Sequence, residues 1–205
     1  MRGKFITLEG IDGAGKSSHV QWIARYLRRR GFRVLVTREP GGTAAGEKLR
    51  RMVLKRREPL HPETETLLMF AARREHLDKL ILPALQKGTW VLCDRFTDAT
   101  YAYQSGGSRV NWEKVRTLEQ WVQSRLQPDL TILFDVSPAV GRRRLGRKRS
   151  PDRFERERAA YYRRVHDAYR RRASENLRRI RVLDAAGSRT EVKVKLEELL
   201  ARFCK

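Results

Sequence analysis

The stretch GIDGAGKS, Gly10 to Ser17, matches the pattern G-x-x-x-x-G-K-[ST] at every fixed position. The apolar residues of 5–8 before it predict a short buried strand, and the helical spacing of apolar residues over 20–27 predicts a helix after it. In this setting the loop binds phosphate, because its backbone N–H groups and the positive end of the helix surround the phosphate oxygens. We therefore expect Lys16 to reach the β- and γ-phosphates of a nucleotide and Ser17 to place its hydroxyl on Mg²⁺. The alternative is a glycine-rich turn that binds nothing, and the complete match in this setting argues against it.

Length and composition indicate one globular domain over 1–205. The chain has 205 residues, of which 40% are hydrophobic, enough for a single core. It has no apolar run long enough for a transmembrane helix, and its N-terminus enters a strand directly, so we expect neither a membrane span nor a signal peptide. Its two cysteines, Cys93 and Cys204, form no disulfide framework and no metal-binding spacing. These features predict a cytoplasmic protein with no membrane partner.

The net charge is unusual, because the formal value is +22 and arginine greatly outnumbers lysine. Three explanations compete: nucleic-acid binding, recognition of a polyanionic small substrate, and an arginine-rich composition spread over a solvated surface. A nucleic-acid-binding module usually carries a recognisable motif or aromatic residues interleaved with its cations. The sequence has neither, so we rank nucleic acid last among the partners.

Strand and helix patterns alternate along the chain. Apolar runs bounded by turn residues predict five strands, at 5–8, 33–37, 90–93, 130–134 and 178–183. Helical patterns cover 20–27, 45–54, 63–85, 112–126, a segment beginning at 137–139, and 191–203. Pro83 predicts a kink or an early end in the third of these helices. The alternation predicts an α/β fold, with a five-stranded parallel sheet flanked by helices and joined by right-handed crossovers.

Three acidic and basic residues lie where ligands are expected. Asp12 would repel phosphate if it pointed into the loop, so it points outward to a sugar hydroxyl or a metal-bound water, or else it only shapes the turn. Asp94 and Arg95 directly follow a buried strand, and ligands in open α/β sheets bind at the carboxyl ends of strands. Asp94 is placed to act on Mg²⁺ or to anchor an arginine, and Arg95 to grip a phosphate. A structural ion pair at the strand end is the alternative.

Two further segments are candidates for the same site. The loop TREPGGT at 37–43 follows another strand, its proline and glycines define a tight turn, and Arg50 comes one helix later. The segment 142–153 is strongly basic and is interrupted by Gly146, Ser150 and Pro151. We expect it to be a mobile loop that closes over the substrates and brings an arginine to the transferring phosphate. An exposed basic linker is the alternative for most of these arginines.

These landmarks together resemble the thymidylate kinases of bacterial type across nearly the whole chain. The matching stretches are 5–17, 37–43, 67–77, 91–104, 128–134 and 152–169. The most specific are TREPGGT at 37–43 and the pair DRF at 94–96 with AYQ at 102–104. The resemblance implies the P-loop NTPase fold of nucleoside monophosphate kinases, with a short lid at about 142–155. It also implies transfer of the γ-phosphoryl group of ATP to dTMP, giving dTDP and ADP, with Mg²⁺ as cofactor.

The resemblance also implies roles for individual residues. Those assigned to ATP are Gly10, Asp12, Gly13, Ala14, Gly15, Lys16, Ser17 and Ser18. Those assigned to dTMP are Asp12, Glu39, Arg50, Phe70, Arg73, Arg95, Thr100 and Gln104. Within these sets, Asp12 meets the deoxyribose 3′-hydroxyl, the arginines at 50 and 95 hold the dTMP phosphate, and Thr100 and Gln104 face the thymine edge. From their positions in the sequence, Ser17 and Asp94 are the candidate metal-binding residues, and the loop 184–187 after the last predicted strand is a candidate backbone contact to adenine.

The chain departs from the family pattern on the long helix, where an aromatic ring stacks on thymine in the family. The matched register puts Met69 at the stacking position and Arg73 at the position that contacts the base, and these residues share a helix face. Phe70 is turned by about 100° around the axis from Met69. Either Met69 covers the thymine, or the helix rotates to present Phe70. We favour Phe70, with a core phenylalanine as the alternative, and keep Arg73 as the base contact.

The resemblance implies a catalytic arginine that lies in the phosphate loop in one type of family member and in the lid in the other. The phosphate loop here has Ala14 and no arginine, so the lid type is implied. Arg153 in the pair at 152–153 resembles the lid signature of the family and is the first candidate, with Arg149 and Arg147 as competitors. Together with Lys16 and Arg95 it would neutralise the transferring phosphate.

The family pattern also implies a homodimer, for which the helices carrying Leu67 and Trp112 offer apolar faces. Two rival functions remain at this point. A P-loop kinase could act on another nucleotide or a small metabolite, although Gln104 and Arg73 favour a pyrimidine. A nucleic-acid-binding NTPase is the lower alternative.

Overall fold

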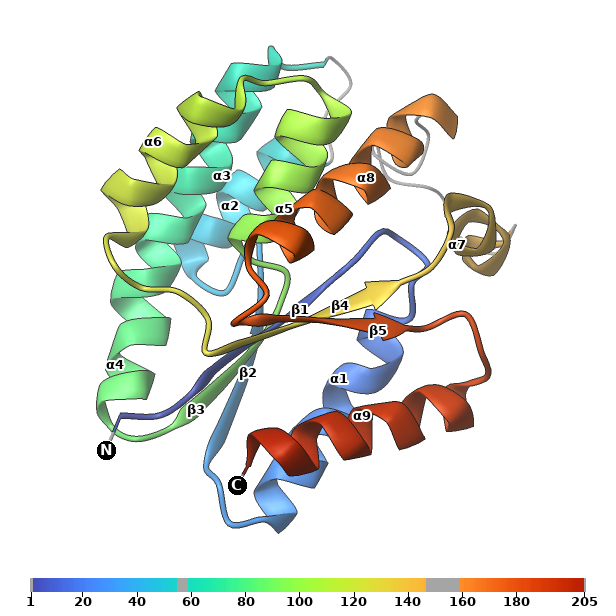
Figure 1. Cartoon of the computed structure of the whole chain (residues 1–205). Helices are drawn as coiled ribbons and strands as arrows, with labels where there is room; N and C mark the ends of the chain where they lie inside the picture. Colours follow the sequence, from blue (N-terminus) through green and yellow to red (C-terminus); the bar gives the residue numbers. More distant parts are fainter. Residues whose placement is uncertain (1, 55–58, 147–158, 205) are drawn as a thin grey trace.

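The computed structural model describes residues 2–54, 59–146 and 159–204 (Figure 1). Its five strands form one sheet in the order β2-β3-β1-β4-β5, and all neighbouring strands are parallel. The strands are β1 Phe5–Glu9, β2 Val34–Arg38, β3 Trp90–Asp94, β4 Leu130–Asp135 and β5 Ile180–Asp184. The predicted α/β fold with a five-stranded parallel sheet is therefore confirmed, and each strand lies close to its predicted position.

Helices cover both faces of the sheet. In Figure 1, α1 and α9 lie below the sheet, and the larger group that includes α3, α6 and α8 lies above it. The helix bounds are α1 Lys16–Arg29, α2 Ala44–Leu54, α3 Pro62–His76, α4 Leu82–Gln86, α5 Thr97–Thr100, α6 Trp112–Gln123, α7 Pro138–Leu145, α8 Ala159–Glu175 and α9 Arg189–Phe203. No helix in the described part of the chain is both long enough and apolar enough to cross a membrane.

The two-sided cover explains why the central strands are buried along most of their length and are mainly apolar. Successive residues of a strand point to opposite faces, so β1 sends Ile6 and Leu8 into the core shared with α1 and α9. Phe5 of the same strand and Val91 of β3 point into a second core with α3, α4 and α6. Because both faces of the sheet are packed in this way, the strands are held firmly and their carboxyl ends form a rigid edge.

The long helix predicted over 63–85 is interrupted, as Pro83 indicated. After α3 a π-helical turn, η1 Leu77–Ile81, leads into the short helix α4. Proline has no N–H and its ring clashes with the preceding turn, so the ordinary helical ladder is broken just before it.

Three helical segments were not delimited from the sequence. They are α5, the π-helical segment η2 Tyr101–Gly107 that follows it, and α8. The first two carry Thr100 and Gln104, and Arg95 lies two residues before α5. Helix α8 packs along η2, where Arg164 donates to the Gly107 carbonyl at 2.7 Å.

Candidate active site

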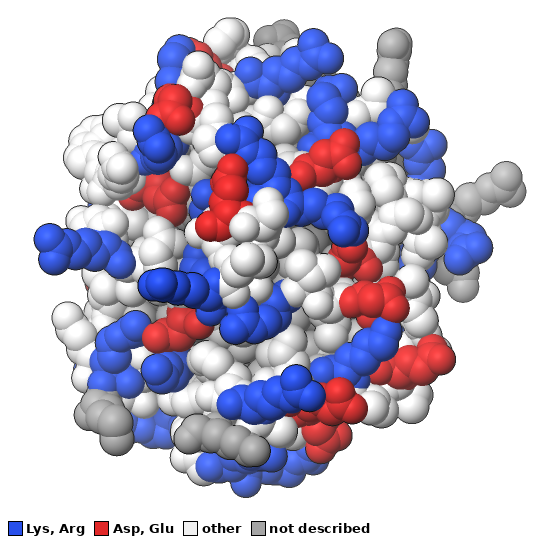
Figure 2. All heavy atoms as spheres, viewed as in Figure 1, with Lys and Arg blue, Asp and Glu red and all other residues white. Residues whose placement is uncertain are grey.

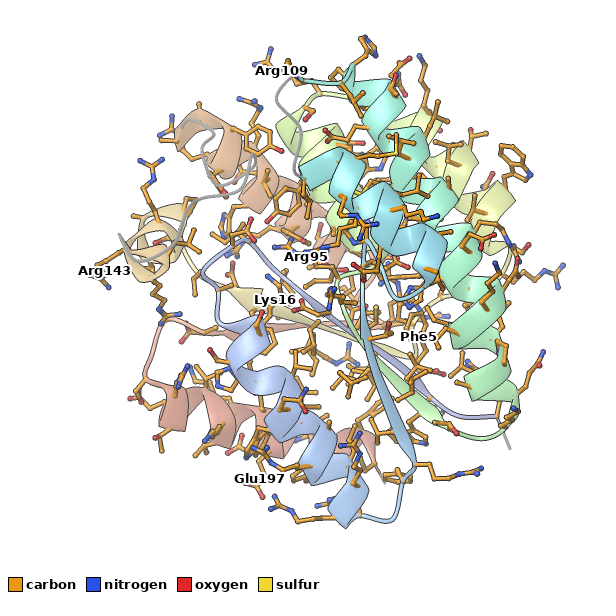
Figure 3. All side chains as sticks on the ribbon, turned by 180° about the vertical axis from the view of Figure 1, so that it is seen from behind. Phe5, Lys16, Arg95, Arg109, Arg143 and Glu197 are labelled. Carbon is orange, nitrogen blue, oxygen red and sulfur yellow. The ribbon has the colours of Figure 1, made fainter. Side chains whose placement is uncertain are left out.

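One cavity of about 740 Å³ opens at the carboxyl ends of the strands. Almost every site residue predicted from the sequence and described by the structure lies on its wall. These are Asp12, Gly13, Ala14, Gly15, Lys16, Ser17, Ser18, Glu39, Arg50, Arg73, Asp94, Arg95, Thr100 and Gln104. Figure 3 shows Lys16 and Arg95 in the interior of the molecule, where the phosphate loop meets the segment after β3. The two predicted residues that do not line the cavity are Gly10 and Phe70.

The phosphate loop is shaped by glycines in conformations that other residues rarely adopt. Gly13 has φ 76°, and a Cβ there would come within 2.1 Å of the Gly141 carbonyl oxygen in α7. Gly10 has φ 133°, and a Cβ there would come within 2.5 Å of the Phe134 carbonyl oxygen. Gly10 therefore shapes the loop from behind, and its carbonyl holds Lys16.

Lys16 is folded back onto its own loop. Its Nζ donates to the carbonyl oxygens of Gly10 at 2.6 Å and Ile11 at 3.0 Å, and the residue is buried. Burial, with the nearby charge of Arg95, lowers the pKa of Lys16 to about 8. An ammonium in this position lacks a full counter-charge, so it favours the arrival of phosphate.

Ser17 and Asp94 form a small oxygen site beside Lys16. The Ser17 hydroxyl donates to Oδ2 of Asp94 at 3.3 Å. The other carboxylate oxygen, Oδ1, is buried and has no partner among the described residues. One hydroxyl and one carboxylate suit Mg²⁺, which keeps several waters and binds through few protein oxygens. The described residues include no cluster of three or more His, Cys, Asp or Glu side chains that could hold a metal by themselves.

Asp12 points out of the phosphate loop and pairs with Arg95. The Arg95 guanidinium donates to Oδ1 of Asp12, and the Tyr103 hydroxyl donates to Oδ2 at 2.8 Å. The same guanidinium lies over the Tyr103 ring, 4.7 Å from its centroid. Arg95 therefore forms an ion pair, here with Asp12. Both residues line the cavity, so an incoming phosphate can compete with Asp12 for the arginine.

Arg50 reaches the same opening from α2. Its Nη1 donates to the Pro40 carbonyl oxygen at 2.8 Å, in the loop that follows β2. Arg38, at the end of β2, also lines the cavity and pairs with Glu47 at 3.0 Å. These contacts hold both guanidinium groups on the wall of the cavity.

Arg73 is fixed at the opposite end of the cavity by a buried network. Its Nε donates to Oε2 of Glu39 at 2.8 Å and its Nη2 donates to the Thr100 hydroxyl at 3.0 Å. The other oxygen of Glu39 lies 3.1 Å from Nδ1 of His76, and Nε2 of His76 lies 2.7 Å from the Thr37 hydroxyl. Nη1 of Arg73 is buried without a partner among the described residues, so it is a donor available to a ligand.

The long helix presents Met69, and not Phe70, to the cavity. Phe70 is 2% exposed and belongs to the core beneath the site, where the Arg73 guanidinium lies 4.6 Å from its ring centroid. This corrects our expectation that Phe70 covers the base. The helix keeps its register because Phe70 fills the apolar space against Phe5 and Phe96, and rotating it outward would empty that space.

Gln104 reaches the cavity from η2. Its Nε2 donates to Oε1 of Glu65 on α3 at 3.0 Å, and both residues are buried. Thr100, one turn earlier, lines the same wall. The segment after β3 therefore delivers Arg95 to one end of the cavity and the two polar groups of Thr100 and Gln104 to the other.

The candidate lid arginines Arg147, Arg149 and Arg153 lie outside the described residues. Just before them, Arg144 at the end of α7 donates to three backbone carbonyls, those of Ala185 at 2.8 Å, Ala186 at 2.7 Å and Gly187 at 3.0 Å. The loop after β5, a candidate contact to adenine, is thus held against α7 on the cavity wall.

Comparison with known proteins identifies relatives that bear the name of the family inferred from the motifs. The sequence model of the thymidylate kinase family matches residues 8–196 of the chain. A thymidylate kinase of Nitrosomonas europaea is 57% identical over 202 residues, which make up 98% of this chain and 94% of that protein. The chain belongs to the thymidylate kinase family.

Two further members of the thymidylate kinase family, one of them a solved structure, also match over nearly the whole chain. The thymidylate kinase of Cupriavidus metallidurans is 57% identical over 201 residues, covering 98% of this chain and 99% of that protein. The crystal structure of thymidylate kinase from Ehrlichia chaffeensis matches with a TM-score of 0.80 at 31% identity, covering 98% of this chain and 99% of that one. The resemblance inferred from the motifs is confirmed.

Sequence reasoning missed several residues on this wall of the thymidylate kinase fold. Tyr103 lies in the AYQ motif, but only the folded chain shows its hydroxyl on Asp12. Arg144 was one of a run of arginines with no distinguishing signal. Glu65 bonds to Gln104, and His76 contacts Glu39 behind Arg73. Both lie on α3 with Arg73, which is eight residues after Glu65 and three before His76, and this shared helix was the only hint.

Proposed function

We propose that the chain transfers the γ-phosphoryl group of ATP to the 5′-phosphate of dTMP, giving dTDP and ADP. The observation that carries this proposal is that a phosphate loop and a set of fixed polar groups suited to a pyrimidine share one cavity. Both substrates are polyanions, so the reaction needs neutralised charge and in-line alignment more than proton transfer.

The donor binds at the phosphate loop. Its β- and γ-phosphates draw the Lys16 ammonium away from the Gly10 and Ile11 carbonyls, and the backbone N–H groups of the loop close around the oxygens. Ser17 and Asp94 would hold Mg²⁺, which would help to neutralise the phosphate charge when bound. The loop 184–187 after β5, part of which lines the cavity, is the candidate backbone contact to the adenine.

The acceptor phosphate binds between Arg95 and Arg50. Arg95 exchanges its ion pair with Asp12 for the dTMP phosphate and holds the attacking oxygen toward the γ-phosphorus. Asp12, relieved of Arg95, takes the deoxyribose hydroxyl, and Tyr103 keeps the carboxylate oriented.

The thymine lies against Met69, with its polar edge toward Arg73, Thr100 and Gln104. The thioether of Met69 offers a polarizable surface to the ring in place of an aromatic side chain. Glu39 acts behind Arg73 and does not need to touch the nucleotide.

The lid supplies the remaining cation. We place the catalytic arginine within the single domain 1–205, in the lid at about 142–155, with Arg153 as first candidate and Arg149 and Arg147 as competitors. Alanine at each position, one at a time, tests the assignment. If all three variants keep a near-normal kcat, the catalytic cation lies elsewhere.

Two copies of the chain would pair through α3 and α6. Leu67 on α3 is 54% exposed and Trp121 on α6 is 77% exposed, and large apolar side chains that open to water often mark an interface. A monomer mass in light scattering at micromolar concentration would contradict this homodimer. Both cysteines are free thiols, in keeping with the cytoplasmic location we propose.

Turnover of a substrate panel tests the activity. With ATP and Mg²⁺ we expect dTMP to be the best acceptor, dUMP a poorer one, and CMP and GMP near background. Equal turnover of CMP or GMP would mean a different P-loop kinase.

A nucleic-acid-binding NTPase would instead show hydrolysis stimulated by DNA or RNA. Figure 2 gives little support to that rival, because Asp and Glu residues lie among the Lys and Arg residues on the visible face and no single basic stripe forms there.

A further inference from the structure

The base end of the cavity holds a glutamine whose amide orientation is decided by a neighbour. Gln104 is 1% exposed, Glu65 is 0% exposed, and the Gln104 Nε2 donates to the Glu65 Oε1 at 3.0 Å. A carboxylate accepts hydrogen bonds and donates none. The amide nitrogen of Gln104 must therefore face Glu65, and its oxygen faces away. Among the described residues that oxygen accepts no hydrogen bond from a side chain or the backbone.

A donor of fixed direction lies on the same wall. The Glu39 carboxylate accepts a hydrogen bond from Nε of Arg73, and the Thr100 hydroxyl accepts one from Nη2. The guanidinium plane is therefore held on two sides. Nη1 is left buried and unpartnered among the described residues. Arg73 and Gln104 both line the cavity, which thus offers one donor and one acceptor to the edge of a bound base.

We propose that Glu65 determines which pyrimidine this site accepts, by holding the Gln104 amide with its oxygen toward the base. Arg73 Nη1 and Gln104 Oε1 then match a 4-oxo pyrimidine, whose O4 accepts and whose N3–H donates. A 4-amino pyrimidine reverses both groups, so it places a donor against Arg73 and an acceptor against the amide oxygen. This inference rests on the proposed function, because it concerns the base of the same acceptor nucleotide.

Glu65 is a positioning residue that acts through Gln104. The two ends of an amide have almost the same shape, so a half-turn of the Gln104 amide would exchange oxygen and nitrogen without steric cost. Glu65 prevents the half-turn, because it would leave the carboxylate facing the amide oxygen with both buried. Its place on the helix suits this role, because Glu65, Met69 and Arg73 follow one another at four-residue spacing and so share the face of α3 that adjoins the cavity.

The Glu65→Gln variant tests the proposal, because a glutamine at 65 can donate as well as accept and so releases the Gln104 amide. We measure kcat/KM for dTMP and for dCMP with saturating ATP. The expected result is a fall of about tenfold or more in the dTMP-to-dCMP ratio, the size of one well-made hydrogen bond. The change should lie in KM for the monophosphate, with kcat for dTMP and KM for ATP nearly unchanged.

The matched control is Glu63→Gln. It makes the same chemical change two residues away on the same helix, where Glu63 pairs with Lys114 at the surface. Its dTMP-to-dCMP ratio should equal that of the parent. A ratio that falls equally in both variants would overturn the proposal, since a general loss of helix stability would then explain it.

An exchange variant, Glu65→Gln with Gln104→Glu, decides the matter if the single variant does not fold. It keeps the buried pair and its volume, and the group facing the base is again an acceptor oxygen. We expect it to reject dCMP as the parent does. The role of Glu65 is overturned if the dTMP-to-dCMP ratio of Glu65→Gln equals that of the parent. It is also overturned if the ratio of the exchange variant is low. A parent that turns over dTMP but accepts dCMP equally well also overturns it, whereas a parent with no activity on dTMP contradicts the proposed function itself.

Discussion

The two ends of the cavity hold their polar groups in different ways. At the phosphate end, Lys16 bonds to loop carbonyls, Arg50 bonds to the Pro40 carbonyl, and Arg95 pairs with Asp12 near the opening. At the base end, Arg73 is 3% exposed and is held by Glu39 and Thr100. The cations of the phosphate end have partners that a phosphate can replace, while the base end is assembled before any ligand arrives.

This difference follows from what each substrate group needs. A phosphate carries enough charge to compete for a guanidinium or an ammonium, so provisional partners keep the cations paired without blocking the site. A neutral base offers only hydrogen bonds, and these discriminate well only when the protein groups cannot turn to suit another base. Substitutions at the phosphate end should therefore slow turnover, and substitutions at the base end should change selectivity or stability.

The largest effect is expected from Lys16→Met. It removes the main protein cation from the β- and γ-phosphates, and kcat should fall by about a factor of 10³ or more. The thermal midpoint should not fall, because the folded protein buries Lys16 at the cost shown by its pKa of about 8. Steady-state kinetics and a melting curve on the same preparation check both parts. A variant that loses stability as well as activity would show that Lys16 also supports the fold.

Arg95→Ala should have the next largest effect. We expect KM for dTMP to rise and kcat to fall, by about a hundredfold in kcat/KM, because one charged contact to the acceptor phosphate is lost. KM for ATP should change much less. Asp12→Asn sharpens the comparison, because it removes the carboxylate that pairs with Arg95 in the absence of substrate. It should lower kcat/KM for dTMP less than Arg95→Ala does. If Arg95→Ala leaves dTMP kinetics unchanged, the acceptor phosphate does not bind there.

Met69→Ala and Phe70→Ala should separate the wall of the site from the core behind it. Met69→Ala should raise KM for dTMP by about tenfold, since it removes the side chain under the base, and should cost less stability than Phe70→Ala because Met69 lines the cavity. Phe70→Ala should lower the free energy of unfolding by about 3 kcal/mol, the usual cost of a cavity where a buried phenylalanine stood. Denaturant unfolding and dTMP kinetics on both variants distinguish the two. The reverse assignment of effects would mean that the helix rotates when the nucleotide binds.

The sequence predicted the phosphate end more completely than the base end. Gly10 to Ser17 is a local motif, so its contacts to phosphate are encoded in consecutive residues and follow from backbone geometry. The base end is made by residues far apart in sequence, such as Glu39 with Arg73, and its second layer of Glu65 and His76 has no local signature. Met69 lines the cavity and Phe70 does not, and which of the two faces the cavity depends on how the whole helix packs.

The segment after β3 was predicted in position but not in form. The sequence located Arg95 at the strand end, yet α5 and η2 contain threonine, serine and glycine and give a weak helical pattern. Tertiary contacts stabilise them: Asp98 is buried between Arg172 at 2.8 Å and Arg179 at 2.6 Å, which come from the distant end of the chain. The helical propensity of a short segment does not reflect stabilisation by residues that are distant in the sequence, so these helical segments could not be predicted from it.

The smallest effect on turnover is expected at Glu9, which is buried outside the lining of the cavity and acts instead on the pH dependence of stability. The residue is fully buried at the end of β1, where it accepts the Phe96 N–H at 2.7 Å and the Tyr169 hydroxyl at 2.9 Å. Burial, together with the charge of Asp98, raises its pKa from 4.5 to about 8. The folded protein therefore keeps a proton that the unfolded chain releases once the pH exceeds 4.5.

That difference sets the sign of a pH dependence. Between pH 4.5 and about 8 the folded state binds more protons than the unfolded state at this group, so the stability it contributes is lost as the pH rises. Glu9→Gln has no proton to lose. The stability of the parent should fall relative to this variant by on the order of 1 kcal/mol per pH unit within the window and level off above it. Urea unfolding of both proteins from about pH 5 to pH 9 measures the difference, and parallel curves would show that Glu9 stays ionised and that Arg95 outweighs its burial.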